Sequence, residues 1–265
     1  MLKSIQMQKV IGFAIILLIV ISGSFSCKKK DELPPDLGYN YFPNQVGKYV
    51  IYDVDSFYYN DFNVPLTIDT FKFQLKEKIQ STYLDNQNRT TLRLERYVRY
   101  YNPTIPYSSL PWVLRDVWAA NRTATTAEKV EENERYIKLA FAVKQEQEWD
   151  GNAQNTLGAQ TYSYEFINQP RTFGGTAFDS VLQVNQKDES SLVGVDYRIE
   201  KYAKRTGMVY KQFIYIQSQP NSDWSDPFLF PFGSDSLALF FSKPIMNRVT
   251  SGWQYTYTYN SSGTE

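Results

Sequence analysis

The sequence predicts a mainly β domain, an antiparallel sheet that curls into a half-barrel or sandwich and carries one or two short helices. Tyrosine and phenylalanine number 21 and 17 among 265 residues, and aromatic and β-branched side chains favour the half-buried surface of a strand. From Tyr39 onward these residues alternate with polar ones, in runs bounded by Asn, Gly, Asp and Pro. Such alternation is typical of antiparallel strands.

The alternating runs define the expected strands, and helical spacing is weak. The best short helix candidates are residues 126–134 and the segment around 106–118. The strands are expected over residues 48–59, 70–82, 90–101, 111–119, 135–143, 159–168, 178–187, 195–205, 208–218, 236–243 and 252–260.

Two connections can be predicted from their chemistry. Residues 83–90 contain Asp85, Asn86 and Asn88, and Asp and Asn tolerate the left-handed conformation that a hairpin tip needs. Residues 204–207 end in Gly207, which can adopt a positive φ. Each connection therefore predicts an antiparallel pair of strands.

Residues 1–26 have the features of a secretory signal peptide. Lys3 and Lys9 precede an apolar run over residues 10–21, and small residues then lead to Cys27. The run is shorter than the roughly 20 residues that span a bilayer, which favours a cleaved signal over a transmembrane helix. Because the single cysteine of the chain stands at the expected cleavage point, we expect Cys27 to carry a lipid anchor.

Residues 27–38 are expected to be the lipidated cysteine and a flexible tether, and residues 39–265 a single β-rich envelope domain. The tether is polar and contains Pro34 and Pro35. Removing Lys3 and Lys9 leaves 28 − 2 = 26 basic residues against 28 acidic ones, a net charge near −2. This charge argues against nucleic acid as a partner.

The residue types argue against most catalytic chemistry. The chain has no histidine, which removes the common general base and transition-metal ligand. With Cys27 acylated, thiol and zinc chemistry are removed as well. We therefore expect no enzyme activity, no cofactor and no metal site.

Two carboxylate pairs are candidates for the acid/base couple of glycoside hydrolysis. Asp53 and Asp55 lie two residues apart, as do Glu146 and Glu148. Because glycosidase carboxylates have set separations and usually come from separate strands, a solvated strand face is the favoured interpretation of both pairs.

The loop over residues 149–155 places Asp150, Asn152 and Asn155 around Gly151. This pattern resembles a calcium loop, but Thr161 occupies the twelfth position, where such a loop has glutamate. An Asx-type turn with Trp149 as its anchor is the favoured interpretation.

Residues 224–233 combine two prolines with many aromatic side chains, which argues against a central strand. Two interpretations remain open. The segment is either a loop over the core, or an apolar ligand or partner site. In the second case Trp224, Phe228, Phe230 and Phe232 are the expected lining residues.

Four motifs extend over most of residues 40–218. They are Val46-Gly47-Lys48-Tyr49, residues 149–152, residues 178–184 and residues 200–210. Together they resemble motifs of the β-rich outer-membrane lipoproteins common in Bacteroidota. The resemblance implies an outer-membrane location, lipid-anchored and facing either the periplasm or the cell surface, and a β-rich fold without a known activity. Since the same group glycosylates Asp-Ser/Thr-aliphatic triplets, the resemblance also implies Ser180 and Ser236 as O-glycosylation sites.

The sequence therefore predicts a lipid-anchored envelope protein that acts as a structural or partner-binding module. It contacts the membrane through the lipid on Cys27. The first alternative is a carrier or binder of a hydrophobic ligand such as a lipid or acyl chain. The second is a carbohydrate-binding or carboxylate-dependent glycoside-processing protein.

Overall fold

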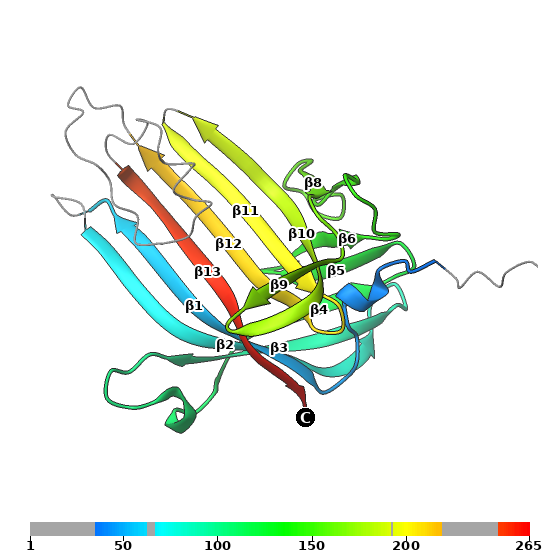
Figure 1. Ribbon diagram of the computed structural model, residues 1–265, viewed down its shortest axis with the longest axis horizontal. Helices are drawn as coiled ribbons and strands as arrows, with labels where there is room; N and C mark the ends of the chain where they lie inside the picture. The colour runs from blue at the N-terminus through cyan, green and yellow to red at the C-terminus, as the bar shows by residue number, and fades with distance from the viewer. Residues whose placement is uncertain (1–34, 63–66, 192, 219–248) are drawn as a thin grey trace, which may run out of the picture. The chain divides into compact units, whose positions relative to one another are not determined.

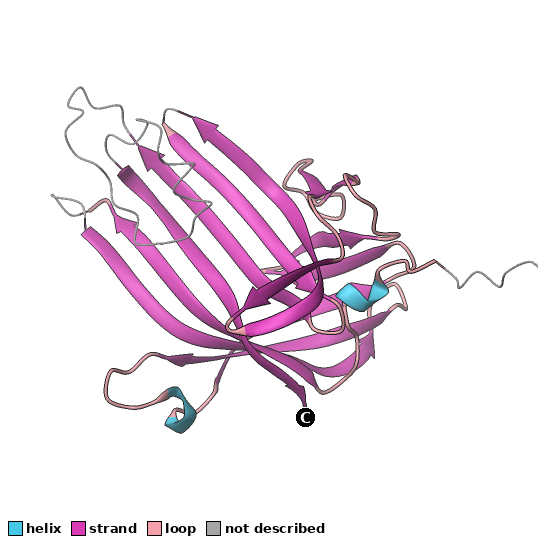
Figure 2. Ribbon diagram, viewed as in Figure 1, coloured by secondary structure: helices cyan, strands magenta, loops and turns pink. Residues whose placement is uncertain are grey.

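The computed structural model describes residues 35–62, 67–191, 193–218 and 249–265, and every strand lies in the compact unit Leu37–Glu265. The regular secondary structure of the described residues is almost all strand, with two short 3₁₀ helices, η1 (Tyr39–Tyr41) and η2 (Tyr107–Ser109) (Figures 1 and 2). The strands are β1 (Lys48–Asn60), β2 (Thr67–Leu84), β3 (Thr90–Tyr100), β4 (Val113–Arg122), β5 (Thr126–Glu131), β6 (Glu134–Ala140), β7 (Glu148–Asp150), β8 (Thr161–Tyr164), β9 (Gln169–Phe173), β10 (Thr176–Ser191), β11 (Gly194–Ala203), β12 (Gly207–Ser218) and β13 (Val249–Thr264).

In the described part of the chain these strands form one 13-stranded antiparallel sheet. Its order is β6-β5-β4-β3-β2-β1-β13-β12-β11-β10-β8-β7, and β9 pairs separately with β10. β13 lies between β1 and β12, so the first and last strands are neighbours at the centre of the sheet (Figure 1). The expected mainly β fold with a curled antiparallel sheet is confirmed.

Most of the expected strands are present with small shifts at their ends. The helix expected over residues 126–134 is wrong, and the one expected around 106–118 is present only as the three-residue 3₁₀ helix η2. Residues 126–134 form β5, a two-residue turn and the start of β6. Glu132 and Asn133 both have positive φ, and two such residues make the tight turn of a hairpin. Residues 106–118 contain only η2 and the first part of β4. The expected strand at 236–243 lies outside the described residues.

Both predicted hairpin tips are confirmed. The Asp85 carboxylate accepts hydrogen bonds from the backbone N–H groups of Gln87 and Arg89, at 2.9 and 3.0 Å, and Asn88 adopts a φ of 57°. In the second tip Gly207 has a φ of 99°. Side-chain acceptors and left-handed residues reverse the chain between β2 and β3 and between β11 and β12.

The segment Leu37–Gly47 contacts five different parts of the sheet at one end, which we call the closed end. Its residues hydrogen-bond to the β4–β5 turn, the β6–β7 connection, β10, the β11–β12 turn and β2. Tyr41, at its centre, is buried, and Phe42 packs against two hydrophobic clusters. The opposite end of the long strands, where β1 ends and β13 begins, is the open end (Figure 1).

The two edges of the sheet, β6 and β7, meet through side chains and single backbone contacts. Ile137 donates its N–H to the carbonyl of Gly151 at 2.8 Å and accepts the indole N–H of Trp149 at 2.9 Å. The hydroxyl of Tyr164 accepts from the N–H of Ala140 at 3.0 Å and donates to its carbonyl at 2.9 Å. The side chains thus satisfy edge groups that would otherwise lack a partner, and they form a seam between the two edges of the curled sheet.

Candidate binding site

Eight charged side chains lie on the inner face of the sheet, and we call them the ion network. They project from β2, β3, β4, β5, β6, β11 and β12, and the four acids balance the four bases. The acids are Glu77, Asp116, Glu131 and Glu200, and the bases are Arg96, Lys129, Lys138 and Lys211.

Glu200 is the most enclosed acid of the network, at 1% exposure. Its carboxylate lies 3.0 Å from the ammonium of Lys138 and 3.3 Å from that of Lys211, and it accepts the hydroxyl proton of Tyr202 at 2.6 Å. Lys138 lies 3.0 Å from Glu131 as well. Glu200 and Lys138 are therefore each compensated by two opposite charges, as buried charges require partners.

The network favours the ionised form of its three glutamates. Burial alone raises the pKa of Glu77, but the nearby Lys129 and Arg96 outweigh burial, and the pKa of Glu77 is lowered. Burial also raises the pKa of Glu131 and that of Glu200, but Lys138 and Lys211 outweigh it, and both pKa values are lowered. The pKa of Lys138 shifts in the opposite sense, because Glu131 and Glu200 raise it despite the burial of the ammonium group.

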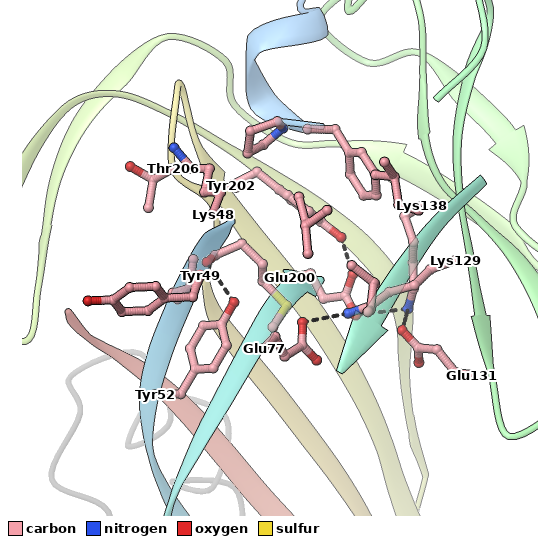
Figure 3. Close-up of a pocket in the computed structure, with 18 residues that line it drawn as sticks. Lys48, Tyr49, Tyr52, Glu77, Lys129, Glu131, Lys138, Glu200, Tyr202 and Thr206 are labelled. Atoms are coloured by element: carbon pink, nitrogen blue, oxygen red, sulfur yellow. Dashed lines mark hydrogen bonds and ion pairs between the residues drawn. The ribbon is translucent and has the colours of Figure 1, made fainter. Parts of the chain in front are cut away.

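A cavity of about 80 Å³ lies between this network and the segment that covers the closed end. Figure 3 shows Glu77, Lys129, Glu131, Lys138, Glu200 and Tyr202 along its wall, and the hydroxyl of Tyr52 hydrogen-bonds to the carbonyl of Met208. A space of this size accommodates a few water molecules. It is smaller than the several hundred Å³ that a lipid or acyl-chain carrier needs.

Three carboxylates from separate strands line this cavity, which is the geometry required of a hydrolase. Their pKa values are lowered, however, and general acid catalysis near neutral pH needs a carboxyl group with a raised pKa. Each carboxylate is also paired with a lysine or arginine. The three carboxylates therefore act as partners of the basic side chains within the ion network.

A second group of side chains lies on the inner face toward the open end, and we call it the aromatic face. Strand register places Tyr58 opposite Trp253, and Trp253 opposite Tyr215. One row deeper, Tyr255 is opposite Phe213. Ser56 of β1 lies opposite both Tyr255 and Phe71, so Phe71 belongs to the same row. The aromatic face is thus Tyr58, Phe71, Phe213, Tyr215, Trp253 and Tyr255, contributed by β1, β2, β12 and β13.

The rings of the aromatic face form an offset stack that continues into the interior. Phe213 and Tyr255 are nearly parallel, with ring centroids 4.9 Å apart, and Phe213 and Trp253 are stacked at 5.9 Å. Tyr257 continues the series toward Tyr52. Toward solvent the rings are open, because Trp253 is 48% and Phe71 52% exposed.

Charged side chains border the aromatic face on β10 and β11. Arg198 lies opposite Phe213, and Asp196 lies opposite Tyr215. Arg198 binds Asp196 through two hydrogen bonds of 2.7 and 2.8 Å, and its guanidinium lies 4.7 Å from the Phe213 ring centroid. At the rim, a solvent-open hollow of about 440 Å³ is lined by Tyr215, Asp196 and Glu189, together with Ser190, Ser191 and Gln217.

Of the residues expected from the sequence for lipidation, ligand lining and O-glycosylation, the structure describes Ser180. Trp224, Phe228, Phe230, Phe232 and Ser236 lie outside the described residues, as does Cys27, so those predictions stay as predictions. Ser180 is half-buried, and its hydroxyl hydrogen-bonds to Asn168 and to the hydroxyl of Tyr41, each at 2.8 Å. O-glycosylation at Ser180 thus requires these contacts to be given up.

Asp53, Asp55 and the glycine loop have local partners. Asp53 accepts hydrogen bonds from Gln74 and Asn260, and Asp55 pairs with Lys72. Asp150 accepts from the N–H groups of Asn152 and Gln160, both at 2.9 Å, which is an Asx turn. Trp149 bonds across the seam to β6.

Among the described tryptophans, Trp253 is the most exposed, and sequence reasoning did not single it out. Trp149 packs in the core, and Trp118 lies beneath Arg96, 3.5 Å from ring centroid to guanidinium carbon. Trp112 contacts Lys76 and Arg99. The signal that could have found the aromatic face is alternate spacing, with Phe213 and Tyr215 on one strand and Trp253 and Tyr255 on the next.

Fold and site together define a half-barrel domain with a charged, closed interior at one end and an open aromatic face at the other. No protein-family model, curated protein or solved structure matches this chain. Within the described ranges there is no helix long and apolar enough to cross a membrane.

Proposed function

We propose that the protein is a lipid-anchored module of the cell envelope that binds a partner or ligand through the aromatic face. The observation that carries the proposal is the exposure of an ordered aromatic stack at one end of a sheet whose interior is otherwise filled by its own side chains. Exposed contiguous aromatic surface is typical of interaction sites. Rigid aromatic side chains also dominate binding energy in interfaces.

The segment between Cys27 and Leu37 limits how far the domain can lie from a membrane. Leu37 accepts a hydrogen bond from Val143 at the closed end. Cys27 precedes Leu37 by 37 − 27 = 10 residues, and ten residues reach about 35 Å at most. A lipid on Cys27, in the outer membrane and facing either the periplasm or the cell surface, would keep the domain within this reach of the bilayer.

Binding rather than catalysis is proposed because the carboxylates of the cavity are paired and their pKa values are lowered. A hydrophobic-ligand carrier is less favoured, since the cavity measures only about 80 Å³ and six charged side chains share its wall with apolar ones.

Photo-crosslinking in intact cells tests the proposal. Benzoyl-phenylalanine replaces Trp253 in one variant and Tyr83 in the other, because the two side chains are equally exposed, at 48% and 47%, and Tyr83 lies outside the aromatic face. We expect a specific adduct from position 253 and none from position 83. Equal adducts from both positions, or none from position 253, would contradict the proposal.

A further inference from the structure

We propose that the ligand of the aromatic face is a neutral glycan chain, an inference that rests on the proposed function. Sugar rings have an apolar face of C–H groups, which packs on the flat surface of an aromatic ring. Trp253, Phe213 and Tyr255 are offset rather than fully overlapped, so part of each ring surface is available. A row of such surfaces suits a ligand made of repeated flat units.

The border of the aromatic face supplies acceptors for sugar hydroxyl groups. Each ionised carboxylate offers about four acceptor positions, and Arg198 occupies two of those on Asp196. Glu189 lies opposite Asp196 on the neighbouring strand, and its side chain is 68% exposed. Asp196 lies directly opposite Tyr215, and Glu189 lies one strand beyond Asp196, so hydrogen-bond acceptors line one side of an aromatic ring, the combination that fixes the orientation of a polar ligand.

The hollow at the rim provides space where these groups meet. It measures about 440 Å³ and is lined by Tyr215, Asp196 and Glu189, within the roughly 300–1,000 Å³ that is typical of small-molecule sites. The hollow continues the row formed by Trp253 and Tyr215. A terminal sugar in the hollow would therefore be in line with sugars stacked on the exposed rings.

The charges of the side chains that border the aromatic face favour a neutral glycan over other ligands. Asp69, Asp196 and Glu189 border the row of Tyr58, Trp253 and Tyr215, while Arg198 and Lys187 are already ion-paired with Asp196 and Glu189. Three acids against two bases disfavour a polyanion. A protein or lipid that covered Glu189 would remove its water, at a cost that sugar hydroxyls avoid by hydrogen bonding.

An array of neutral oligosaccharides of four to eight sugars, covering glucans, mannans, galactans and xylans, tests the inference with the full-length protein, and heparin is the anionic comparison. We expect at least one neutral glycan to bind. Trp253→Ala and Tyr215→Ala should each weaken its affinity at least tenfold, and Tyr83→Ala should leave it unchanged. Asp196→Asn, nearly isosteric, should weaken it as well, and it keeps the inference testable if an aromatic variant fails to fold.

Three results would overturn the inference: no binding of any neutral glycan, stronger binding of heparin, or glycan binding that survives Trp253→Ala. The crosslinking experiment separates this failure from that of the proposed function. A protein adduct at position 253 with a blank array would refute the glycan and keep the binding module. Neither adduct nor glycan binding would refute both.

Discussion

Replacing Lys138 with methionine should destabilise the protein by about 3–5 kcal/mol. Lys138 contacts Glu131 and Glu200, both at 3.0 Å, and each contact corresponds to roughly 5 kcal/mol of gross Coulomb attraction at an effective dielectric constant of about 20. Desolvation of the ammonium group offsets much of this gain. What remains is chiefly the cost of leaving the two glutamates with Lys211 as their main compensating charge.

The measurement is the free energy of unfolding from urea titration, followed by tryptophan fluorescence. A matched control is Lys72→Met, because Lys72 forms a pair of 3.3 Å with Asp55 at the surface, where both side chains are largely exposed. Exposed pairs of this kind contribute about 0–1 kcal/mol, so the control should be close to the wild-type value.

A second change distinguishes charge from packing. Glu200→Gln added to Lys138→Met restores neutrality to this half of the network, and the glutamine oxygen can still accept from Tyr202 and Lys211. The double variant should therefore be more stable than Lys138→Met alone. Additive losses in the double variant, or a loss in Lys138→Met no larger than in Lys72→Met, would refute the reasoning.

Three further outcomes are expected. The three glutamates of the network have pKa values below the ordinary 4.5. Their contribution to stability is therefore complete above about pH 5.5 and is lost as the pH falls through the lowered pKa values. The urea midpoint should drop steeply below about pH 4. Tyr164→Phe removes both hydrogen bonds to Ala140 and should cost about 1–3 kcal/mol, with faster amide exchange in β6. Gly151→Ala places a methyl group 2.4 Å from the Tyr162 ring and should lower the melting temperature. Gly158→Ala, in the same loop, is the control, because its methyl group meets no atom within 4 Å. It should lower the melting temperature less, through the positive φ of Gly158 alone.

The strands could be predicted because their inner and outer faces differ in polarity. β1 shows this plainly, since Val50, Tyr52 and Val54 are buried while Ile51 and Asp53 between them are half-exposed. The hairpin tips were predictable because Asp85 and Gly207 are residues with specific turn conformations. These signals are local, and local chemistry suffices to find an element and its turn.

The region 126–134 was predicted wrongly because its Ala, Glu and Lys residues favour helix. Strand pairing decides the outcome instead. Glu128 lies opposite Asn121 in β4 and Ile137 in β6, and Lys129 reaches Glu77 of β2 at 2.8 Å. From the sequence alone these charged residues are expected to face solvent, because their partners lie tens of residues away in the chain.

The candidate site was less predictable than the fold. Sequence reasoning placed apolar binding residues in the segment 224–233, chosen for its density of aromatic side chains. That segment lies outside the described residues, and its prediction stays a prediction. The aromatic face comes from four separate strands, and Tyr58 and Tyr215 become neighbours only through β13 between them. A surface assembled across strands has no compact signature in the sequence.

The position of β13 has a consequence for how the chain folds. β13 pairs with β1 over most of its length, and Lys48 lies opposite Thr264, 264 − 48 = 216 residues later. Until that late strand arrives, β1 to β6 and β7 to β12 are two partial sheets, each with an unpaired central edge. Contacts so distant in sequence make folding slow, and the two exposed edges are open to wrong pairing until they close. We therefore expect the two partial sheets to need protection from aggregation while the chain is being synthesised or exported.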